Sequence, residues 1–151
     1  MKAVISLGSN LENRKLNLEI AITHIEQLLN NLVISPFIQT KPVGGPPQDD
    51  FLNAVVIGEC ELSAESLLTK LLEIEVQMGR VRQIKWGPRI IDLDLIVYGD
   101  QVIDSEFLKL PHPLAQSRSF VLSPWLVIDP DGEIPGVGAI KTLLASIPSS
   151  S

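Results

Sequence analysis

Hydrophobic residues follow two different periods along the chain, and their order predicts the secondary structure. The run "AVISL" at 3–7 is short, apolar and rich in β-branched residues, which is typical of a buried strand. Ser9 and Glu12 then have the spacing of a capping box, which predicts the start of a helix. Apolar residues recur beyond it at three and four positions, as on one face of a helix: Leu18, Ala21, Ile22, Ile25, Leu28 and Leu29.

Two further strands, separated by a loop, are expected in the middle of the chain. Residues 32–40 have the composition of a strand, in which Pro36 indicates an edge position or a bulge. Residues 41–50 contain three prolines and two glycines, which predicts a loop long enough to bind a ligand. Another strand is expected over 51–62.

A second helix is expected between Ser63, a favoured N-cap residue, and Gly79, a residue that commonly ends helices. Its periodic positions are Ala64, Leu67, Leu68, Leu71, Glu75 and Met78. Residues 90–103 predict a hairpin, in which a strand and a second short strand flank a turn at Gly99 and Asp100. After "LPHP" at 110–113, short helices and turns are expected.

These elements give the order β-α-β-β-α-β, followed by the hairpin strand and C-terminal helices. The order predicts an α+β fold with a ferredoxin-like core, whose antiparallel sheet carries both helices on one face. C-terminal helices on the other face would complete a three-layer α-β-α sandwich. The length of 151 residues suits one domain over 1–151, with a frayed tail at about 147–151.

Two aspartates interrupt the strand expected after residue 90. Because side chains alternate along a strand, Asp92 and Asp94 should share a face, about 6 to 7 Å apart at their Cα atoms. The faces are predicted as Asp92, Asp94, Ile96 and Tyr98 against a core face of Ile91, Leu93, Leu95 and Val97. Two ionised carboxylates so placed need a cation, and one Mg²⁺ or a pair of metal ions suits them. The alternative is a solvated face whose acids pair with surface Lys or Arg.

Basic residues cluster just before the aspartates. Four of the twelve Lys and Arg residues lie within 80–89: Arg80, Arg82, Lys85 and Arg89. Beside a metal site, such a cluster suits a polyphosphate, because guanidinium groups bind phosphate oxygens in pairs. A solvated turn that balances acids elsewhere is the alternative. The "LGSN" segment at 7–10 is either a plain turn or a turn whose N–H groups bind an anion.

Composition narrows the class of protein. A net charge of −6 disfavours nucleic-acid binding, and the sequence contains neither a P-loop nor the protein-kinase motifs. The single cysteine, Cys60, excludes an internal disulfide and a cysteine-based zinc site, and is expected to be a buried apolar residue. Without a long apolar run or a signal peptide, we expect a cytoplasmic protein that does not bind membranes.

Short motifs spread over nearly the whole chain are shared with one enzyme family. In chain order they are "LGSN", "T-x-P-x-G" at 40–44, "FLNAVV" at 51–56, "E-x-x-x-GRVR" at 75–82, "WGPRIIDLDLIVYGD" at 86–100, "LPHP" at 110–113 and "R-x-F" at 118–120. The sequence therefore resembles the 6-hydroxymethyl-7,8-dihydropterin pyrophosphokinases of folate biosynthesis. The resemblance implies transfer of the diphosphate of ATP to the hydroxymethyl oxygen of the pterin, with release of AMP.

The resemblance also implies a set of site residues. Two Mg²⁺ ions would be held by Asp92 and Asp94, which together with Arg82 and Arg89 form the expected catalytic set. ATP, as co-substrate, would be bound by Glu75, Arg80, Arg82, Trp86, Arg89, Leu95, His112 and Arg118, of which Arg80, Arg82 and Trp86 belong to a closing loop. The pterin would be bound by Thr40, Pro42, Val43, Phe51, Asn53, Asp92 and Phe120, with Phe51 and Phe120 stacking on its faces. A monomer is expected.

Two departures from the family pattern and several alternatives accompany these roles. The segment between Arg82 and Trp86 is one residue shorter, and Phe51 stands where a Tyr is familiar, so a hydroxyl contact is lost. Phe51 and Phe120 could instead be core residues, and His112 a turn residue held by a backbone hydrogen bond. The competing functions are a two-metal phosphodiesterase or nucleotidyltransferase, which needs a third carboxylate, and a non-catalytic ferredoxin-like ligand-binding module.

Overall fold

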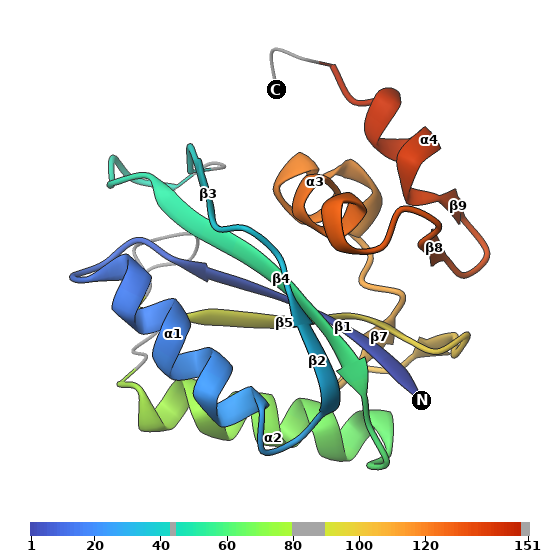
Figure 1. Ribbon diagram of the computed structural model, residues 1–151, viewed down its shortest axis with the longest axis horizontal. Helices are drawn as coiled ribbons and strands as arrows, with labels where there is room; N and C mark the ends of the chain where they lie inside the picture. The colour runs from blue at the N-terminus through green and yellow to red at the C-terminus, as the bar shows by residue number, and fades with distance from the viewer. Residues whose placement is uncertain (43–44, 80–89, 149–151) are drawn as a thin grey trace.

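An antiparallel sheet runs through the middle of the molecule (Figure 1). The structure, a computed structural model, describes residues 1–42, 45–79 and 90–148. The sheet has the order β2-β4-β1-β5, and β3 also pairs with β4. These strands are β1 (Lys2–Ser9), β2 (Asn30–Ile34), β3 (Ile38–Thr40), β4 (Phe51–Glu59) and β5 (Asp92–Tyr98).

Helices cover both faces of the sheet, as Figure 1 shows. The first core lies between the sheet and two helices, α1 (Arg14–Ile25) and α2 (Ala64–Gln77). The second core lies on the opposite face beneath α3 (Ser119–Ile128) and α4 (Ile140–Ala145). The short elements are β6 (Ile103–Asp104), β7 (Lys109–Leu110), the 3-10 helix η1 (Ala115–Ser117), β8 (Glu133–Ile134) and β9 (Gly138–Ala139). The predicted α+β fold with an antiparallel sheet and three layers is confirmed.

The start of α1 differs from the prediction. Ser9 belongs to β1, and the N-cap of α1 is Asn13, whose side chain accepts a hydrogen bond from the Leu16 N–H at 3.1 Å. Ser9 is not free to cap the helix, because its hydroxyl accepts a hydrogen bond from the Asn17 side chain at 3.1 Å. The helix also ends at Ile25, so that Leu28 and Leu29 pack on the first core from the segment after it.

The strand expected over 32–40 is divided in two at Pro36. The residue before it, Ser35, bonds twice to Val55 of β4: its N–H donates to the Val55 carbonyl at 2.9 Å, and its hydroxyl accepts from the Val55 N–H at 2.8 Å. β2 and β3 both pair with β4 and lie beyond it in the sheet, which confirms the edge position and the irregularity predicted from Pro36.

The start of α2 is confirmed, whereas β4 is shorter than predicted. The Ser63 hydroxyl accepts a hydrogen bond from the Ser66 N–H at 3.1 Å, and Gly79 has a φ of +84° just after the helix. β4 ends at Glu59 and not at residue 62.

The predicted hairpin is wrong, although the turn at Gly99 is present. β6 pairs with β7 and not with β5. The β1–β5 register also shifts between Val4 and Ile5, which pair with Val97 and Leu95 and leave Ile96 as an extra residue. Val97 therefore faces the second core and Tyr98 the first, opposite to the predicted faces. In the first core, the Tyr98 hydroxyl hydrogen-bonds the carbonyl oxygens of Cys60 and Leu62.

Cys60 is buried in the first core, as predicted.

Among the described residues, no helix combines the length and the apolar character needed to cross a membrane.

Candidate active site

Three neighbouring strands align one row of residues on the face of the sheet that carries α3. Gly8 of β1 pairs with Asn53 of β4 on one side and with Asp92 of β5 on the other. Paired residues of an antiparallel sheet point to the same face, so Asn53 and Asp92 flank Gly8 on this face. Asp94 lies on the same face in the next row, paired with Ser6. The predicted shared face of Asp92 and Asp94 is confirmed, since Leu93 and Leu95 lie in the core on the opposite face.

Gly8 leaves the floor of this row open. A Cβ atom at residue 8 would lie 2.9 Å from Asn53 Oδ1 and 3.4 Å from Phe51 Cδ1. The first distance is shorter than normal contact, so any side chain there would displace Asn53. The expectation of a turn at "LGSN" is corrected by the strand assignment, because Gly8 and Ser9 lie within β1.

Asn53 is held by Thr40 of the adjacent strand. Its Nδ2 donates a hydrogen bond to Thr40 Oγ1, and only 5% of the residue is exposed. Thr40 pairs with Phe51, which is half-buried, and Pro42 follows, also half-buried. Four residues predicted to bind the pterin therefore lie together on two paired strands and the segment after them. Val43, the next one, is outside the described residues.

Arg118 and Phe120 approach the aspartates from the second core. Arg118 Nη1 lies 4.0 Å from Asp94 Oδ2, and the guanidinium carbon is 5.4 Å from the centre of the Phe120 ring. Such a position suits a cation–π contact. Phe120 lies in α3 and is only partly buried against the second core, so one aromatic residue borders the site from above the sheet.

His112 is attached to β5 at its bulge. Its backbone N–H donates to the carbonyl of Ile96, the extra residue of β5, at 2.9 Å. Its Nδ1 accepts from the Leu114 N–H at 3.2 Å, which leaves Nε2 to carry the ring proton. Burial lowers the pKa of His112 from its usual 6.5, against the pull of Asp94, which raises it; Arg118 lowers it further. The ring is therefore a neutral donor near Asp94 at neutral pH.

Two predicted ATP contacts, Glu75 and Leu95, are almost fully buried. Glu75 is only 3% exposed, and its Oε2 accepts a hydrogen bond from the Leu93 N–H at 2.8 Å. Leu95 is also 3% exposed, with its side chain in the first core. The Leu95 side chain therefore faces away from the aspartates. Its backbone groups point to the same edge of β5 as those of Leu93, two residues earlier.

The predicted closing-loop residues Arg80, Arg82 and Trp86 lie outside the described residues, as does the predicted phosphate contact Arg89. The two catalytic arginines and half of the predicted ATP contacts are therefore expectations from the sequence alone.

The donors on this face suit magnesium. The described residues include no group of three or more His, Cys, Asp and Glu placed to hold a metal ion. A zinc site with three or four protein ligands is therefore not present among them. Mg²⁺ is typically bound by one or two carboxylates, and substrate phosphates and water complete its shell. Asp92 and Asp94, half-buried on one face beside an open row, fit that pattern.

Sequence analysis did not identify a set of buried polar residues near the site, namely Ser9, Asn10 and Asn17. Asn10 is 2% exposed, and its Nδ2 donates to Gln48 Oε1 at 2.7 Å and to the Asp49 carbonyl at 3.0 Å. Asn17 Nδ2 donates to the Leu11 carbonyl at 2.9 Å as well as to Ser9. The signal was present in "LGSN", whose polar residues hold backbone segments in place.

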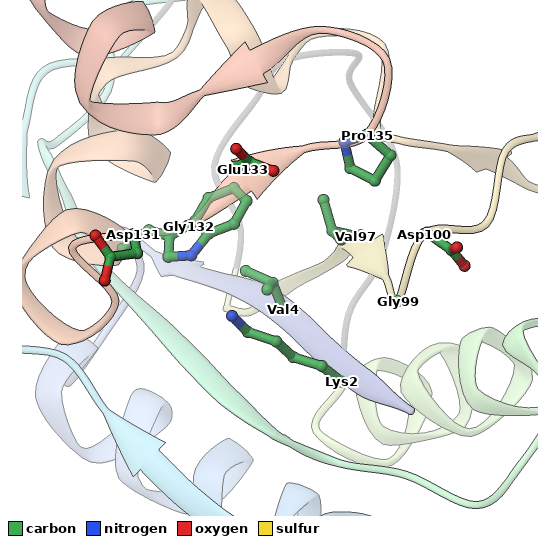
Figure 2. Close-up of a pocket in the computed structure, with 10 residues that line it drawn as sticks. Lys2, Val4, Val97, Gly99, Asp100, Asp131, Gly132, Glu133 and Pro135 are labelled. Atoms are coloured by element: carbon green, nitrogen blue, oxygen red, sulfur yellow. The ribbon is translucent and has the colours of Figure 1, made fainter.

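A separate cavity of about 350 Å³ lies at the opposite end of β1 (Figure 2). Its apolar walls include Val4 and Val97, and its charged residues are Lys2, Asp100, Asp131 and Glu133. Lys2 is engaged by Asp129, with 2.6 Å between Nζ and Oδ2. None of the residues that line this cavity is among the predicted site residues.

Comparison with known proteins identifies the class and then the family. Curated relatives include the 2-amino-4-hydroxy-6-hydroxymethyldihydropteridine pyrophosphokinases of Pseudomonas aeruginosa and Haemophilus influenzae. The first is 36% identical over 97% of this chain and 92% of its own length, and the second 40% identical over 94% and 90%. The molecule is thus a pyrophosphokinase.

Residues 4–130 match the family model of 7,8-dihydro-6-hydroxymethylpterin-pyrophosphokinase. The chain belongs to this family, and it is an enzyme of folate biosynthesis.

Solved structures agree on the fold. The chain matches a triple mutant of HPPK-DHPS from Plasmodium falciparum with a TM-score of 0.77 and 16% identity. It also matches an HPPK-DHPS in complex with substrates, with a TM-score of 0.75 and 14% identity. The matches cover 95% and 96% of this chain but only 42% and 44% of those longer chains.

The lowered pKa of His112 predicts a pH dependence of stability. A folded state that disfavours the protonated ring gains stability above the usual pKa of 6.5 and loses it as the pH falls through the lowered value. Between pH 7 and 5, the unfolding free energy of the wild type should therefore fall more steeply than that of His112→Gln, by at most about 1.4 kcal/mol per pH unit. Urea titrations at several pH values measure both slopes; equal slopes would contradict the assignment.

Proposed function

We propose that the row of Asn53, Gly8 and Asp92 brings the pterin and the metal-bound phosphates of ATP together. The supporting observation is the strand register, in which Gly8 pairs with Asn53 on one side and with Asp92 on the other. The acceptor side, on β4, and the phosphate side, on β5, are then separated by the single strand β1. This is two inter-strand spacings, roughly 9 to 10 Å, so the reacting groups of the two bound substrates would meet above Gly8.

Asp92 and Asp94 are the proposed ligands of two Mg²⁺ ions. When bound, the ions would neutralise phosphate charge and orient the diphosphate for attack. The two aspartates contribute a rigid seat, because Leu93 and Leu95 between and after them are fixed in the first core. Arg118, 4.0 Å from Asp94, and the neutral His112 are proposed to donate hydrogen bonds to phosphate oxygens.

The pterin is proposed to lie between Phe51 and Phe120. Each ring would contribute stacking of about 0.5 to 1.5 kcal/mol, and the absence of a side chain at Gly8 leaves room for the flat ligand. The Asn53 amide, fixed by Thr40, would read the donor and acceptor edge of the pterin. Pro42 and Val43 are proposed to add contacts from the loop. Phe51 and Phe120 are both only partly buried, which supports a ligand contact over a purely structural role.

ATP is proposed to lie along the outer edge of β5. The Leu95 backbone offers hydrogen-bonding groups on that edge, and Glu75 holds the strand there through the Leu93 N–H. Glu75 is thus proposed to position the strand that contacts the nucleotide. Arg80, Arg82, Trp86 and Arg89 remain the predicted closing loop and phosphate contacts.

The proposed reaction forms one bond and breaks another at the β-phosphorus of ATP. The hydroxymethyl oxygen of the pterin bonds to this phosphorus, and the bond from it to the α–β bridging oxygen breaks, so AMP leaves with that oxygen. The hydroxyl proton is assigned to Asp94. Arg82 and Arg89 would stabilise the charge that develops in the transition state, and exclusion of water would prevent hydrolysis.

The two competing functions are less well supported. A two-metal phosphodiesterase needs a third carboxylate at the metal site, and the described residues do not group three such ligands. Membership of a pyrophosphokinase family contradicts a non-catalytic module. A monomeric state and a cytoplasmic location remain predictions.

Product analysis tests the reaction. Incubation of the protein with ATP, Mg²⁺ and 6-hydroxymethyl-7,8-dihydropterin should yield AMP and the pterin diphosphate in equal amounts, because the whole diphosphate is transferred. Anion-exchange chromatography separates AMP from ADP. Formation of ADP with a pterin monophosphate would refute pyrophosphoryl transfer.

Substitutions test the metal seat. Asp92→Asn and Asp94→Asn should each lower kcat by roughly 100-fold or more, because a neutral amide neither holds Mg²⁺ strongly nor balances its charge. Asp100→Asn is the matched control: it removes a carboxylate from the exposed turn after β5 and should keep kcat within about twofold of wild type. Near-normal turnover in either test variant would show that its carboxylate is not a metal ligand.

Gly8→Ala tests the floor of the pterin site. The added Cβ would displace Asn53, so the KM for the pterin should rise by roughly tenfold, about the value of one lost hydrogen bond. Steady-state kinetics in the Gly8→Ala, Asn53→Ala and double variants measure the coupling. The double variant should be little worse than Asn53→Ala alone, since both changes act on one side chain. If the effects of the two single variants on the pterin KM were additive in the double variant, Gly8 would act independently of Asn53 and the prediction would be wrong.

A further inference from the structure

Arg14 connects helix α1 to the strands that form the proposed pterin site. Its Nη1 donates a hydrogen bond to the Asp50 carbonyl at 2.9 Å, and its Nη2 donates to Gln39 Oε1 at 3.4 Å. Gln39 Nε2 donates in turn to Asp50 Oδ2 at 3.2 Å. Three residues, from α1, from β3 and from the position just before β4, thus form a closed set of hydrogen bonds, here called the Arg14 clamp.

The Arg14 clamp lies directly beside the residues proposed to bind the pterin. Asp50 precedes Phe51, and Gln39 precedes Thr40, which pairs with Phe51. Because side chains alternate along a strand, Gln39 points to the α1 face while Thr40 points to the site face. Arg14 therefore lies on the far side of the sheet from the proposed pterin site.

A second anchor holds the adjoining residues of the same segment. Asn10 donates to Gln48 and to the Asp49 carbonyl, just before the point where Arg14 binds the Asp50 carbonyl. Three consecutive residues, 48–50, are therefore fixed from the end of β1 and from the start of α1. Their position determines where the chain enters β4 and presents Phe51.

Arg14 is an unexpected residue for its position in α1. The helix has no acidic residue in its first turn, where a negative charge would be favoured by the helix dipole, and instead begins with Arg14 and Lys15. Removing either positive charge should affect the helix similarly. Arg14 donates to both Asp50 and Gln39 through its fork of N–H groups, and this separates its role from that of Lys15.

We infer that Arg14 is a positioning residue for the pterin, which holds Asp50 and Gln39 so that Phe51 and Thr40 are correctly placed across the sheet. This inference rests on the proposed pterin site. Since the clamp lies at the β3–β4 end of the site, away from Asp92 and Asp94 on β5, it should influence pterin binding without influencing ATP binding.

Steady-state kinetics of Arg14→Ala test the inference. The KM for the pterin should rise by roughly five- to tenfold, while kcat and the KM for ATP stay within about twofold of wild type. Lys15→Ala, which removes the neighbouring charge, should leave all three values within about twofold. Arg14→Lys should recover part of the loss, because an ammonium can donate to the Asp50 carbonyl but does not form the planar fork.

Gln39→Ala provides a second route to the same answer if Arg14→Ala does not fold. It removes the other side of the clamp and should raise the pterin KM selectively, and its effect should be less than additive with that of Arg14→Lys. An unchanged pterin KM in both Arg14→Ala and Gln39→Ala, or an equal rise in the KM for ATP, would overturn the inference.

Asn53→Ala in the same assay separates the clamp from the site on which it depends. If Asn53→Ala raises the pterin KM but Arg14→Ala and Gln39→Ala do not, the positioning role inferred for Arg14 is wrong, whereas the proposed pterin site stands. If Asn53→Ala has no effect, the proposed site itself is wrong, and the inference about Arg14 fails with it.

Discussion

The pairing of β1 with β4 on one side and with β5 on the other is the constraint on which the site depends. Gly8 lies at the centre of this pairing, between Asn53 and Asp92. A slip of β5 by one residue would turn both aspartates into the first core and expose Leu93 and Leu95. The buried leucines therefore fix the register, and the register fixes the distance between the acidic pair and the Asn53 side.

The apolar cores on the two faces of the sheet have different roles in building the site. The first core, under α1 and α2, anchors the strands. The second core fills only part of its face, beneath α3 and α4, and brings Arg118 and Phe120 to the border of the polar row. The extra residue in β5, Ile96, joins this strand to the segment that contains His112, because the Ile96 carbonyl accepts a hydrogen bond from the His112 N–H. A local irregularity of β5 thus holds the segment that carries His112, whose ring interacts with Asp94.

Membership of the pyrophosphokinase family gives this geometry its chemical meaning. The sheet alone brings together a carboxylate pair, an amide and an open floor, a combination that other enzymes could use. The relatives at 36% and 40% identity identify the reaction, and the low-identity structures support the fold. Arg14, at the start of α1, contacts the strands of this arrangement from the face of the sheet that carries α1.

The sequence by itself determined what short-range patterns control. Alternation put Asp92 and Asp94 on one face, Ser63 and Gly79 bounded α2, and Pro36 interrupted the edge strand. It could not determine which strand pairs with which segment, so the pairing of β6 with β7 was missed. Nor could it locate the bulge at Ile96 or the hydrogen bonds of Ser9 and Arg14. The bulge and the Arg14 contacts join segments far apart in the chain, whereas the β6–β7 pairing and the Ser9–Asn17 bond depend on where β5 and β1 end in the sheet. Only the tertiary structure decides both kinds of contact.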